Sequence, residues 1–417
     1  MSQKDWQVYK FGGTSMKNAD ALEQVGNLVT NSDAENLIVV VSAMGGMTDA
    51  LLQFSETQDS KLIEDIQSLY IETTDSLVKN VSSRLSLIEA FKEDIQEISE
   101  IAKLKDHASV SIEENEILGF GEIWTSKLLH AYLSALGEIE TSWLNPMDFL
   151  IIQNEDMGAN VNWSKSKEAF TQAIQDKSGK VIMGGFIASD IEGKSTNLGR
   201  NGSDYSASIL GSLSEAESVT IWTDVDGVLT GDPRVVNQAR MIEQMTYDEA
   251  IELSYFGAEV IHPKTMAPLM HKEIPLYIKN TFNPESLGTS INSQQKNTRA
   301  VKGISTIKDI ALLNLEGTGM IGVPGIVNRL GNVLQQANIS IVLISQASSE
   351  HSICFAVRSK DAKTAADVIK QEFKDDFKNE NLSAIQIEED CSILAIVGSG
   401  MTGTKGIAAR FFNAISL

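Results

Sequence analysis

The chain has 417 residues, and 34 lysine and arginine residues against 56 aspartate and glutamate residues give it a net charge of −22. An acidic chain lacks the basic face that nucleic acid or an anionic membrane requires, so neither is expected as its main partner. Hydrophobic residues make up 42% of the chain, enough for sizeable buried cores, and the length suggests two or three domains.

Targeting and redox signals are few. No apolar run approaches the roughly 18 residues that span a bilayer. The N-terminal sequence MSQKDWQVYKFGG has no apolar stretch after its charges, so a secretory signal is not expected. Cys354 and Cys391 form no C-x-x-C pair and predict neither a disulfide framework nor a thiolate metal site. We therefore expect a soluble cytoplasmic protein.

Strand and helix patterns alternate in the first part of the chain. Strands are expected at 7–11, 37–41, 180–183 and 218–222, and the second of these is continuously apolar and rich in β-branched residues, which is typical of a strand buried on both faces. Residues 48–136 are predicted to be mostly helical. This order predicts an α/β domain with a mainly parallel sheet, in which ligands bind at the carboxyl ends of the strands.

An internal repeat occupies the last part of the chain. The segment from Gly317 to Ile326 recurs from Gly398 to Ile407, a constant offset of 81 positions, and Arg329 matches Arg410. Each copy is expected to begin with a strand, at 310–315 and 392–397, and to continue into a helix, at 326–336 and from 407 onward.

The first copy continues further than the second. Strands are expected at 339–345 and 352–357, followed by a helix near 361–374, and this β-α-β-β-α order predicts a small ferredoxin-like regulatory unit. The second copy reaches Leu417 about where its first helix should still be running. We expect its final helix to need another chain to cover it.

Both copies contain the pattern G-x-G-x-x-G between a strand and a helix. A dinucleotide site also needs an acidic residue about 20 positions further on. The first copy has Ile341, Val342 and Leu343 in that region, and the second has no residue there. We therefore interpret the pattern as a repeated tight turn at a domain or effector surface.

Three glycine-rich segments could hold a phosphorylated ligand. In KFGGTS, Lys10 ends a buried strand, and the following backbone N–H groups could cradle phosphate oxygens, although an ordinary turn with a solvated lysine is the alternative. In GRNGSDYSA, Ser203 or Asp204 would cap a helix, and Arg200 could offer its planar fork to a carboxylate. In WTDVDGVLTGDPR, the carboxylates suit a ribose or hydrated Mg²⁺ and Arg234 suits phosphate, whereas plain turn chemistry is the alternative.

Two single residues carry weaker signals. Glu122, in Gly119-Phe120-Gly121-Glu122, adds a carboxylate in a glycine-rich setting, although most glutamates lie at the surface. His262 has no second histidine at ligand spacing, so it is interpreted as a structural histidine rather than a zinc ligand. The sequence assigns no metal ligands.

These motifs together resemble one family, the aspartokinases. The resemblance rests on KFGGTS at 10–15, VSAMGGMT at 41–48, GFGE at 119–122, GRNGSDYSA at 199–207, WTDVDGVLTGDPRVV at 222–236, SYFGAEVIHPKT at 254–265 and IKNTFNP at 278–284, in matching order and spacing. The tail resembles the ACT domains of aspartokinases, and the segment 344–352 looks most like the kinase half of bifunctional aspartokinase/homoserine dehydrogenases. Those enzymes are typically inhibited by threonine.

The resemblance implies an amino-acid-kinase fold that transfers the γ-phosphoryl group of ATP, with Mg²⁺, to the β-carboxylate of L-aspartate. It implies that Lys10 stabilises the transferred group and that Asp204 positions this lysine. Arg200 would bind the α-carboxylate of aspartate, and Glu122 its ammonium group. The other residues implied at the site are Ser42, Thr48 and Ser203 for aspartate and Gly12, Gly13, Thr14, Thr223, Asp224 and Arg234 for ATP.

The resemblance also implies a regulatory arrangement. It assigns 1–297 to the catalytic domain, 298–390 to a first ACT domain and 391–417 to the truncated start of a second. A threonine or lysine effector would lie near Ile344 and Gln346, and ACT units would pair in a homodimer or higher homo-oligomer. One departure is Glu259, where the family often has lysine in F-G-A-K-V facing the nucleotide; whether Lys264 compensates stays open.

The residue inventory suits this chemistry. A carboxylate nucleophile has a reference pKa of about 4 and is ionised at neutral pH, so no general base is required. The reaction needs positioning and relief of negative charge on phosphate. Two alternatives remain: another kinase of the same superfamily, acting on glutamate, acetylglutamate or a nucleotide, and an amino-acid-binding regulatory protein that has lost turnover.

Overall fold

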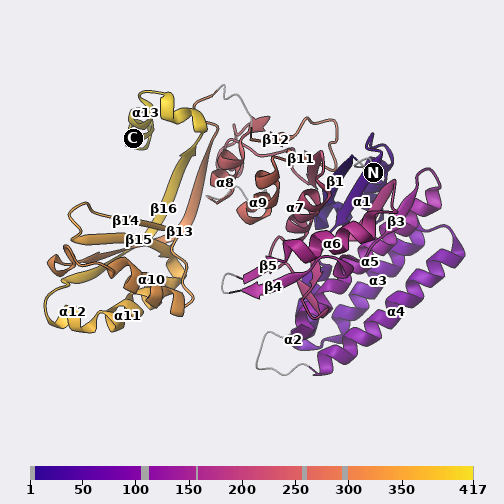
Figure 1. Ribbon diagram of the computed structural model, residues 1–417, viewed down its shortest axis with the longest axis horizontal. Helices are drawn as coiled ribbons and strands as arrows, with labels where there is room; N and C mark the ends of the chain where they lie inside the picture. The colour runs from indigo at the N-terminus through magenta and orange to yellow at the C-terminus, as the bar shows by residue number, and fades with distance from the viewer. Residues whose placement is uncertain (1–4, 105–111, 156–157, 256–260, 294–298, 417) are drawn as a thin grey trace. The chain divides into compact units, whose positions relative to one another are not determined.

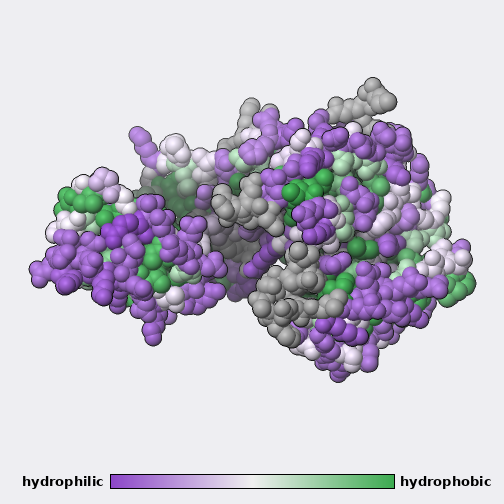
Figure 2. All heavy atoms as spheres, turned by 60° about the horizontal axis from the view of Figure 1, so that its bottom comes forward, coloured by the Kyte–Doolittle hydropathy of each residue, from purple (hydrophilic) through white to green (hydrophobic). Residues whose placement is uncertain are grey.

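The computed structural model describes residues 5–104, 112–155, 158–255, 261–293 and 299–416. The chain forms two compact units, one containing the residues up to 303 together with those from 398 onward, and the other containing residues 304–397 (Figure 1). Hydrophilic side chains cover most of the described surface seen in Figure 2. The predicted boundaries at 297/298 and 390/391 stay a prediction.

An eight-stranded sheet forms the centre of the first unit. In the described residues its strand order is β10-β12-β11-β9-β1-β2-β6-β3, and every neighbouring pair is parallel except β11 with β12. The bounds are β1 Trp6–Phe11, β2 Asn36–Val41, β3 Thr141–Trp143, β6 Lys180–Gly184, β9 Ser218–Thr223, β10 Gln244–Met245, β11 Leu276–Asn280 and β12 Thr289–Ile291. The mainly parallel sheet predicted from the sequence is confirmed.

The central strands are apolar because they are buried on both faces. Every residue of β2 is buried, because β1 and β6 flank it and helices cover both faces of the sheet.

The predicted helical region holds α2 Met47–Thr57, α3 Ser60–Leu77, α4 Val81–Leu104 and α5 Ile112–Leu136. The aromatic rings of Tyr70 and Phe91 stack where α3 meets α4, with their centroids 4.2 Å apart. The remaining helices of this unit are α1 Ala19–Thr30, α6 Trp163–Ile174, α7 Gly202–Ser214, α8 Tyr247–Tyr255, α9 Pro263–Lys272 and α13 Ile407–Ile415. Two small hairpins, β4 Ile152–Glu155 with β5 Gly158–Val161 and β7 Ile187–Ser189 with β8 Ser195–Asn197, complete it.

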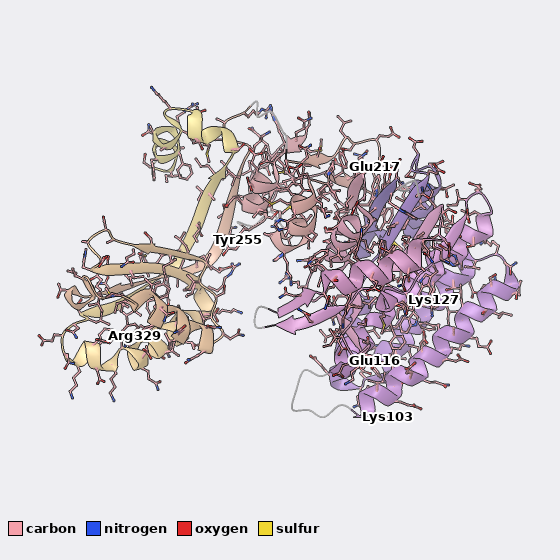
Figure 3. The ribbon with its side chains drawn as sticks, viewed as in Figure 1. Lys103, Glu116, Lys127, Glu217, Tyr255 and Arg329 are labelled. Carbon is pink, nitrogen blue, oxygen red and sulfur yellow. The ribbon has the colours of Figure 1, made fainter. Side chains whose placement is uncertain are left out.

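The second unit is a four-stranded sheet covered by helices. Its strand order is β14-β15-β13-β16, and its core packs residues of β13 and β15 against α10 and α11. The bounds are β13 Gly303–Glu316, α10 Ile326–Gln336, β14 Leu343–Gln346, β15 Ser352–Arg358, α11 Ala362–Glu372, α12 Lys374–Lys378 and β16 Ala384–Val397. The guanidinium of Arg329, labelled in Figure 3, ties α10 to α11 and α12 through ion pairs of 3.0 Å with Glu372 and Asp376.

Three strand predictions for this unit need correction. The strands expected at 310–315 and 392–397 are halves of longer strands, β13 and β16, and each carries an aspartate with positive φ near its middle, Asp309 at 57° and Asp390 at 59°. The strand expected from Ile339 begins only at Leu343. Ile339 instead closes the end of α10, where its N–H donates to Leu334 O (2.9 Å) after Asn338 at φ 54°.

The repeated glycines are explained by close backbone contacts. A Cβ added to Gly317 would collide with the carbonyl oxygen of Asn381, and one added to Gly398 would collide with that of Ala300. Asn381 and Ala300 are themselves 81 positions apart, so each copy of the loop packs on the segment that precedes the other copy's strand. Close packing against a neighbouring backbone segment therefore requires these glycines, which the sequence pattern alone did not indicate.

A buried carboxylate holds the second loop to the first unit. Glu249 on α8 is 2% exposed, and its Oε1 accepts hydrogen bonds from both the backbone N–H and the hydroxyl of Ser399, each 2.8 Å long. Its Oε2 accepts from the N–H of Thr246 (2.9 Å). This single side chain therefore satisfies donors on two segments that are distant in sequence.

We expect Glu249→Ala to release this loop. Leaving the Ser399 donors without their acceptor should cost about 1–3 kcal/mol and expose residues 398–415 to hydrogen exchange and protease. Glu252→Ala, at an exposed position of the same helix, is the matched control. Equal protection of this segment in both variants would contradict the assigned contact.

The helix that follows this loop has an uncovered apolar face. No residue of α13 is buried, and Phe412 and Ile415 are 63% and 53% exposed. The expectation that this helix lacks cover within the chain agrees with these exposures.

Candidate active site

Two glycines at the end of β6 allow helices α5 and α7 to pack closely against this strand. A Cβ on Gly184, the last residue of β6, would lie 3.0 Å from Cβ of Glu122 on α5. A Cβ on Gly185 would lie 2.6 Å from Cβ of Ser203 on α7. Because neither contact leaves room for a side chain, β6, α5 and α7 meet at one edge of the sheet, where parallel sheets bind their ligands.

An ion pair lies at the centre of this edge. Nζ of Lys10, near the end of β1, is 2.6 Å from Oδ1 of Asp204 in the first turn of α7, and the two side chains are 10% and 14% exposed. A Cβ on Gly12 would lie 3.5 Å from the same Nζ, so the ammonium group lies over the loop that follows its own strand. The positive charge of Lys10 therefore lies next to the glycine-containing loop.

The start of α7 differs from the sequence expectation. The N-cap is Asn201 at φ 59°, without a side-chain cap hydrogen bond, and Ser203 and Asp204 lie inside the first turn. The capping expectation was wrong because the Asp204 carboxylate is held by Lys10 instead. Ser203 is buried against Gly185.

Glu122 is a fully buried carboxylate facing the same edge. It is 4% exposed, and its Oε2 has no hydrogen-bond partner among the described residues. Burial raises the pKa of Glu122 to about 8, while a backbone hydrogen bond with Ala43 and the charge of Lys10 act in the opposite direction. A buried carboxyl oxygen without a hydrogen-bond donor destabilises the folded state, and a bound cationic group would supply the missing donor.

Two further predicted residues, Ser42 and Thr48, lie in the loop after β2 and at the start of α2, respectively. The N–H of Ser42 donates to Phe11 O (3.0 Å), which ties this loop to β1, and Thr48 lies in the first turn of α2. A buried threonine that sequence reasoning missed holds the loop from the other side. Thr125 Oγ1 accepts from the N–H of Met44 (3.1 Å) and donates to Gly121 O (2.8 Å).

The loop after β1, which the sequence resemblance assigns to phosphate, forms a short 3₁₀ turn, η1 Gly13–Met16. Gly12 and Gly13 are half-buried, Thr14 is exposed and Ser15 is fully buried. The N–H of Gly12 donates to Trp222 O (3.3 Å) on β9. The loop is thus anchored to the strand that carries the expected nucleotide residues.

Those nucleotide residues follow β9. Thr223 Oγ1 donates to Asp224 Oδ1 (3.2 Å), and both residues are at least partly exposed at the carboxyl end of the strand. Arg234 lies in a later turn, 78% exposed, with its guanidinium bonded to both carboxylate oxygens of Asp232. Thr223 and Asp224 therefore lie at the carboxyl end of β9, whereas Arg234 forms an ion pair with the nearby Asp232.

A group of cationic residues lies near the start of α9. Burial lowers the pKa of His262, and the positive charges of Lys264 and Arg200 act in the same direction. His262 accepts at Nδ1 from the N–H of Lys264 (3.2 Å) and so caps the helix, as expected of a structural histidine. The ammonium of Lys264 also lies 5.2 Å from the centroid of the Tyr205 ring. Glu259 lies outside the described residues.

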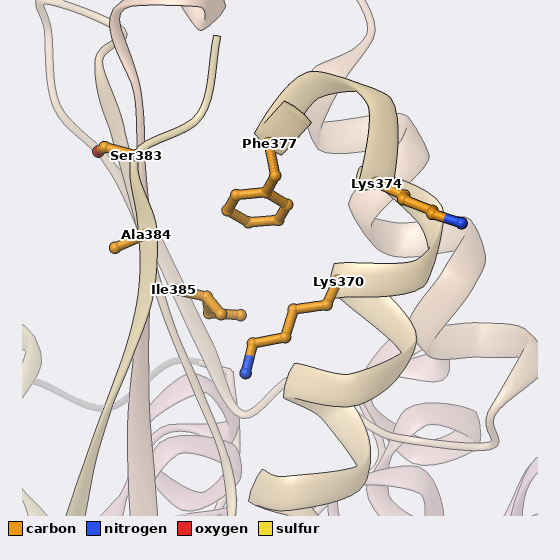
Figure 4. A pocket seen from close by; sticks show the side chains of 6 residues that line it. All are labelled: Lys370, Lys374, Phe377, Ser383, Ala384 and Ile385. Atoms are coloured by element: carbon orange, nitrogen blue, oxygen red, sulfur yellow. The ribbon is translucent and has the colours of Figure 1, made fainter. Parts of the chain in front are cut away.

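The expected effector residues lie in the second unit. Ile344 and Gln346 are on β14, all four residues of which are exposed. A cavity of about 440 Å³ in this unit lies elsewhere, between α11, α12 and the start of β16, with Lys370 and Phe377 facing it (Figure 4). No cluster of three or more histidine, cysteine, aspartate or glutamate side chains able to hold a metal occurs among the described residues.

The described helices include none that is both long and apolar enough to cross a bilayer.

Comparison with known proteins agrees with this geometry. The sequence profile of the amino acid kinase family matches residues 5–280, and that of the ACT domain matches residues 313–373. The chain belongs to the amino acid kinase family. Its similarity is to aspartokinases: it is 36% identical to bifunctional aspartokinase/homoserine dehydrogenase 1 of Arabidopsis thaliana over 99% of this chain and 47% of that protein. The chain thus spans about half the length of the curated relatives it matches.

Solved structures give the same result. The structure of E. coli aspartokinase III in complex with aspartate and ADP (R-state) aligns with a TM-score of 0.82 at 25% identity, covering 99% of this chain and 91% of that one. The complex with lysine and aspartate (T-state) aligns with a TM-score of 0.73 at 26% identity, covering 94% and 87%. The resemblance to aspartokinases, the fold class and the ACT domain predicted from the sequence are confirmed.

Proposed function

We propose that this chain is an aspartokinase that transfers the γ-phosphoryl group of ATP to the β-carboxylate of L-aspartate. The observation that carries the proposal is the buried pair of Lys10 and Asp204 beside the buried carboxyl group of Glu122, whose Oε2 has no hydrogen-bond partner among the described residues. The ammonium group of Lys10 suits a phosphoryl group, and the carboxyl group of Glu122, once ionised, suits an ammonium group. The similarity to a structure with aspartate and ADP bound supports the same substrates.

Lys10 would stabilise the phosphoryl group in transit. Asp204 holds its ammonium group at 2.6 Å and so fixes its position before substrate binds. The N–H groups of Gly13 and Thr14 would donate to the phosphate oxygens, whereas that of Gly12 donates to Trp222 O and holds the loop in place. No base is needed, because the attacking carboxylate of aspartate is ionised at neutral pH.

Aspartate would be held at both ends. The fork of Arg200 would bind the α-carboxylate, and Glu122 would bind the ammonium group, with Ser42, Thr48 and Ser203 lining the space between. The partner-free Oε2 of Glu122 supports this role, because a bound ammonium group would supply the missing donor.

ATP would extend over the end of β9. Thr223 and Asp224 would face the nucleotide, and Arg234 would reach it only after leaving Asp232. Mg²⁺ would arrive with ATP, since this ion keeps several waters and is usually bound by one or two carboxylates together with substrate phosphates. Its contribution would be to neutralise charge on the phosphates.

The ACT unit would bind an amino-acid effector near Ile344 and Gln346 on β14. Threonine is the effector that the sequence resemblance favours, and the aligned T-state structure contains lysine. The uncovered faces of β14 and α13 support pairing of this chain in a homo-oligomer. Activity measured against threonine and lysine concentration, with oligomer size measured in parallel, tests both points. A monomer inhibited cooperatively by threonine would contradict the proposed pairing.

The substrate assignment is tested by the ADP released with different acceptors. L-Aspartate should support turnover, whereas glutamate, acetylglutamate and uridine monophosphate should not. Turnover with one of the other acceptors alone would favour a different kinase of the family. No turnover with any acceptor would favour a regulatory protein.

Arg200→Lys should separate the two substrates. A point charge replaces a bidentate fork, so KM for aspartate should rise about tenfold or more while KM for ATP changes little. Steady-state kinetics with each substrate varied in turn provide the measurement, and Arg240→Lys, outside the proposed aspartate site, is the control. An equal rise in both KM values would contradict the assigned contact.

A further inference from the structure

A pair of buried hydroxyl groups, on two residues with no role assigned so far, joins two sequence motifs of the site. The side-chain oxygens of Ser15 and Thr281 are 2.7 Å apart, and both residues are completely buried. Ser15 belongs to the loop after β1, and Thr281 is the first residue after β11. These residues are 266 positions apart in sequence.

The pair crosses an intervening strand. In the sheet order, β9 lies between β1 and β11, so the two connected loops follow strands that are two spacings, or about 10 Å, apart. The hydrogen bond therefore passes over the end of β9, where Thr223 leads into the expected nucleotide residues.

Backbone hydrogen bonds close this connection into a ring. The N–H of Gly12 donates to Trp222 O (3.3 Å), and the N–H of Thr281 donates to Thr223 O (2.8 Å). Within the first loop, the N–H of Ser15 donates to Gly12 O (2.9 Å). The phosphate loop, the end of β9 and the start of the loop after β11 are thus mutually fixed.

A second contact holds Thr281 from outside the ring. The side-chain amide of Gln24 on α1 donates to Thr281 O (3.1 Å). Thr281 is therefore fixed by its N–H, its carbonyl and its hydroxyl, and a buried threonine with all three groups bonded has little freedom to move.

We propose that Ser15 and Thr281 are positioning residues that set the distance between the phosphate loop and the nucleotide residues at the end of β9. The proposal rests on the proposed function, because it needs ATP to lie across both segments. If the hydroxyl pair is lost, Gly12 and Thr223 can shift relative to each other, and a nucleotide that contacts both loses affinity.

The experiment compares four variants: Ser15→Ala, Thr281→Val, the double variant and Thr281→Ser. Each single variant leaves one buried hydroxyl without a partner and should lower the thermal midpoint. The double variant replaces both partners by apolar groups, so its midpoint should return close to that of the wild type. Thr281→Ser keeps the hydroxyl and should behave like the wild type. Thr74→Val, which removes a buried hydroxyl inside α3, is the matched control.

The nucleotide readouts separate positioning from stability. In the double variant, KM for ATP and the calorimetric Kd for ADP should rise about tenfold, while KM for aspartate changes less than about twofold. A double variant with a restored midpoint and unchanged ADP affinity would overturn the proposal, as would equal rises in both KM values. If the wild type binds ADP but phosphorylates no aspartate, the proposed reaction fails, and the ADP titrations still decide the role of the hydroxyl pair.

Discussion

Lys10→Ala should lower kcat about 10²–10³-fold, with a smaller change in KM for aspartate. The lysine ammonium is held 2.6 Å from the Asp204 carboxylate, at the position where charge on the transferred phosphoryl group would develop. Removing one preorganised electrostatic group of this kind typically has an effect of about this size. Steady-state ADP release at saturating ATP provides the measurement.

Loss of the fold must be separated from loss of chemistry. Lys10→Ala leaves Asp204 buried without its partner, which can cost about 3–5 kcal/mol of stability. The double variant Lys10→Met/Asp204→Asn removes both charges and should unfold near the wild-type temperature while staying inactive. Lys61→Ala, which removes a surface lysine at the start of α3, is the control. A folded Lys10 variant with near-normal kcat would exclude the proposed role.

Binding of aspartate should release a proton at neutral pH. Burial raises the pKa of Glu122 to about 8, so in the empty site this carboxyl is mostly protonated at pH 7. An ammonium ligand requires the ionised form, and the apparent affinity for aspartate should therefore rise about tenfold per pH unit between pH 6 and 7.5. Calorimetry in buffers of different ionisation enthalpy measures the proton release directly.

Glu122→Gln tests whether this carboxylate is the source of the proton. The variant should remove both the pH slope and the proton release, and it should weaken aspartate binding at pH 8. Glu116→Gln, on the same helix and labelled in Figure 3, should keep both. Proton release that persists in Glu122→Gln would assign the effect to another group.

The raised pKa of Glu122 should also make the free energy of unfolding depend on pH. A carboxyl group whose pKa is higher in the folded than in the unfolded state binds more protons when folded. Between the ordinary value of 4.5 and about 8, the folded chain should therefore lose stability as pH rises, and Glu122→Gln should reduce this loss.

Much of the fold followed from local patterns in the sequence. The apolar run of β2 depends on neighbouring residues alone, and the predicted bounds of 37–41 differ by one residue from those of the strand, Asn36–Val41. The long strands β13 and β16 were only half recognised, because their first halves contain consecutive polar residues, such as Ser305–Thr306 in β13 and Glu388–Asp390 in β16, and a positive-φ aspartate interrupts each strand.

The candidate site could be assembled only partly from sequence. Lys10 and Asp204 stood in separate motifs, and the resemblance to aspartokinases, rather than spacing, paired them. The link between Ser15 and Thr281 was not foreseen, because nothing in the spacing of 266 residues indicates that two hydroxyl groups meet. The motif IKNTFNP was noticed, but hydrogen bonding of its threonine depends on the sheet order, which a single sequence does not give.

The most direct test of the proposed reaction identifies the bond that forms. Incubation of the chain with ATP, Mg²⁺, L-aspartate and hydroxylamine should give β-aspartyl hydroxamate in equal amount to ADP, because hydroxylamine attacks the acyl phosphate and releases phosphate. The hydroxamate should be absent when aspartate or ATP is omitted and nearly absent with the Lys10→Met/Asp204→Asn variant. ADP formed without hydroxamate, or hydroxamate formed from glutamate instead, would contradict the assignment of this chain as an aspartokinase.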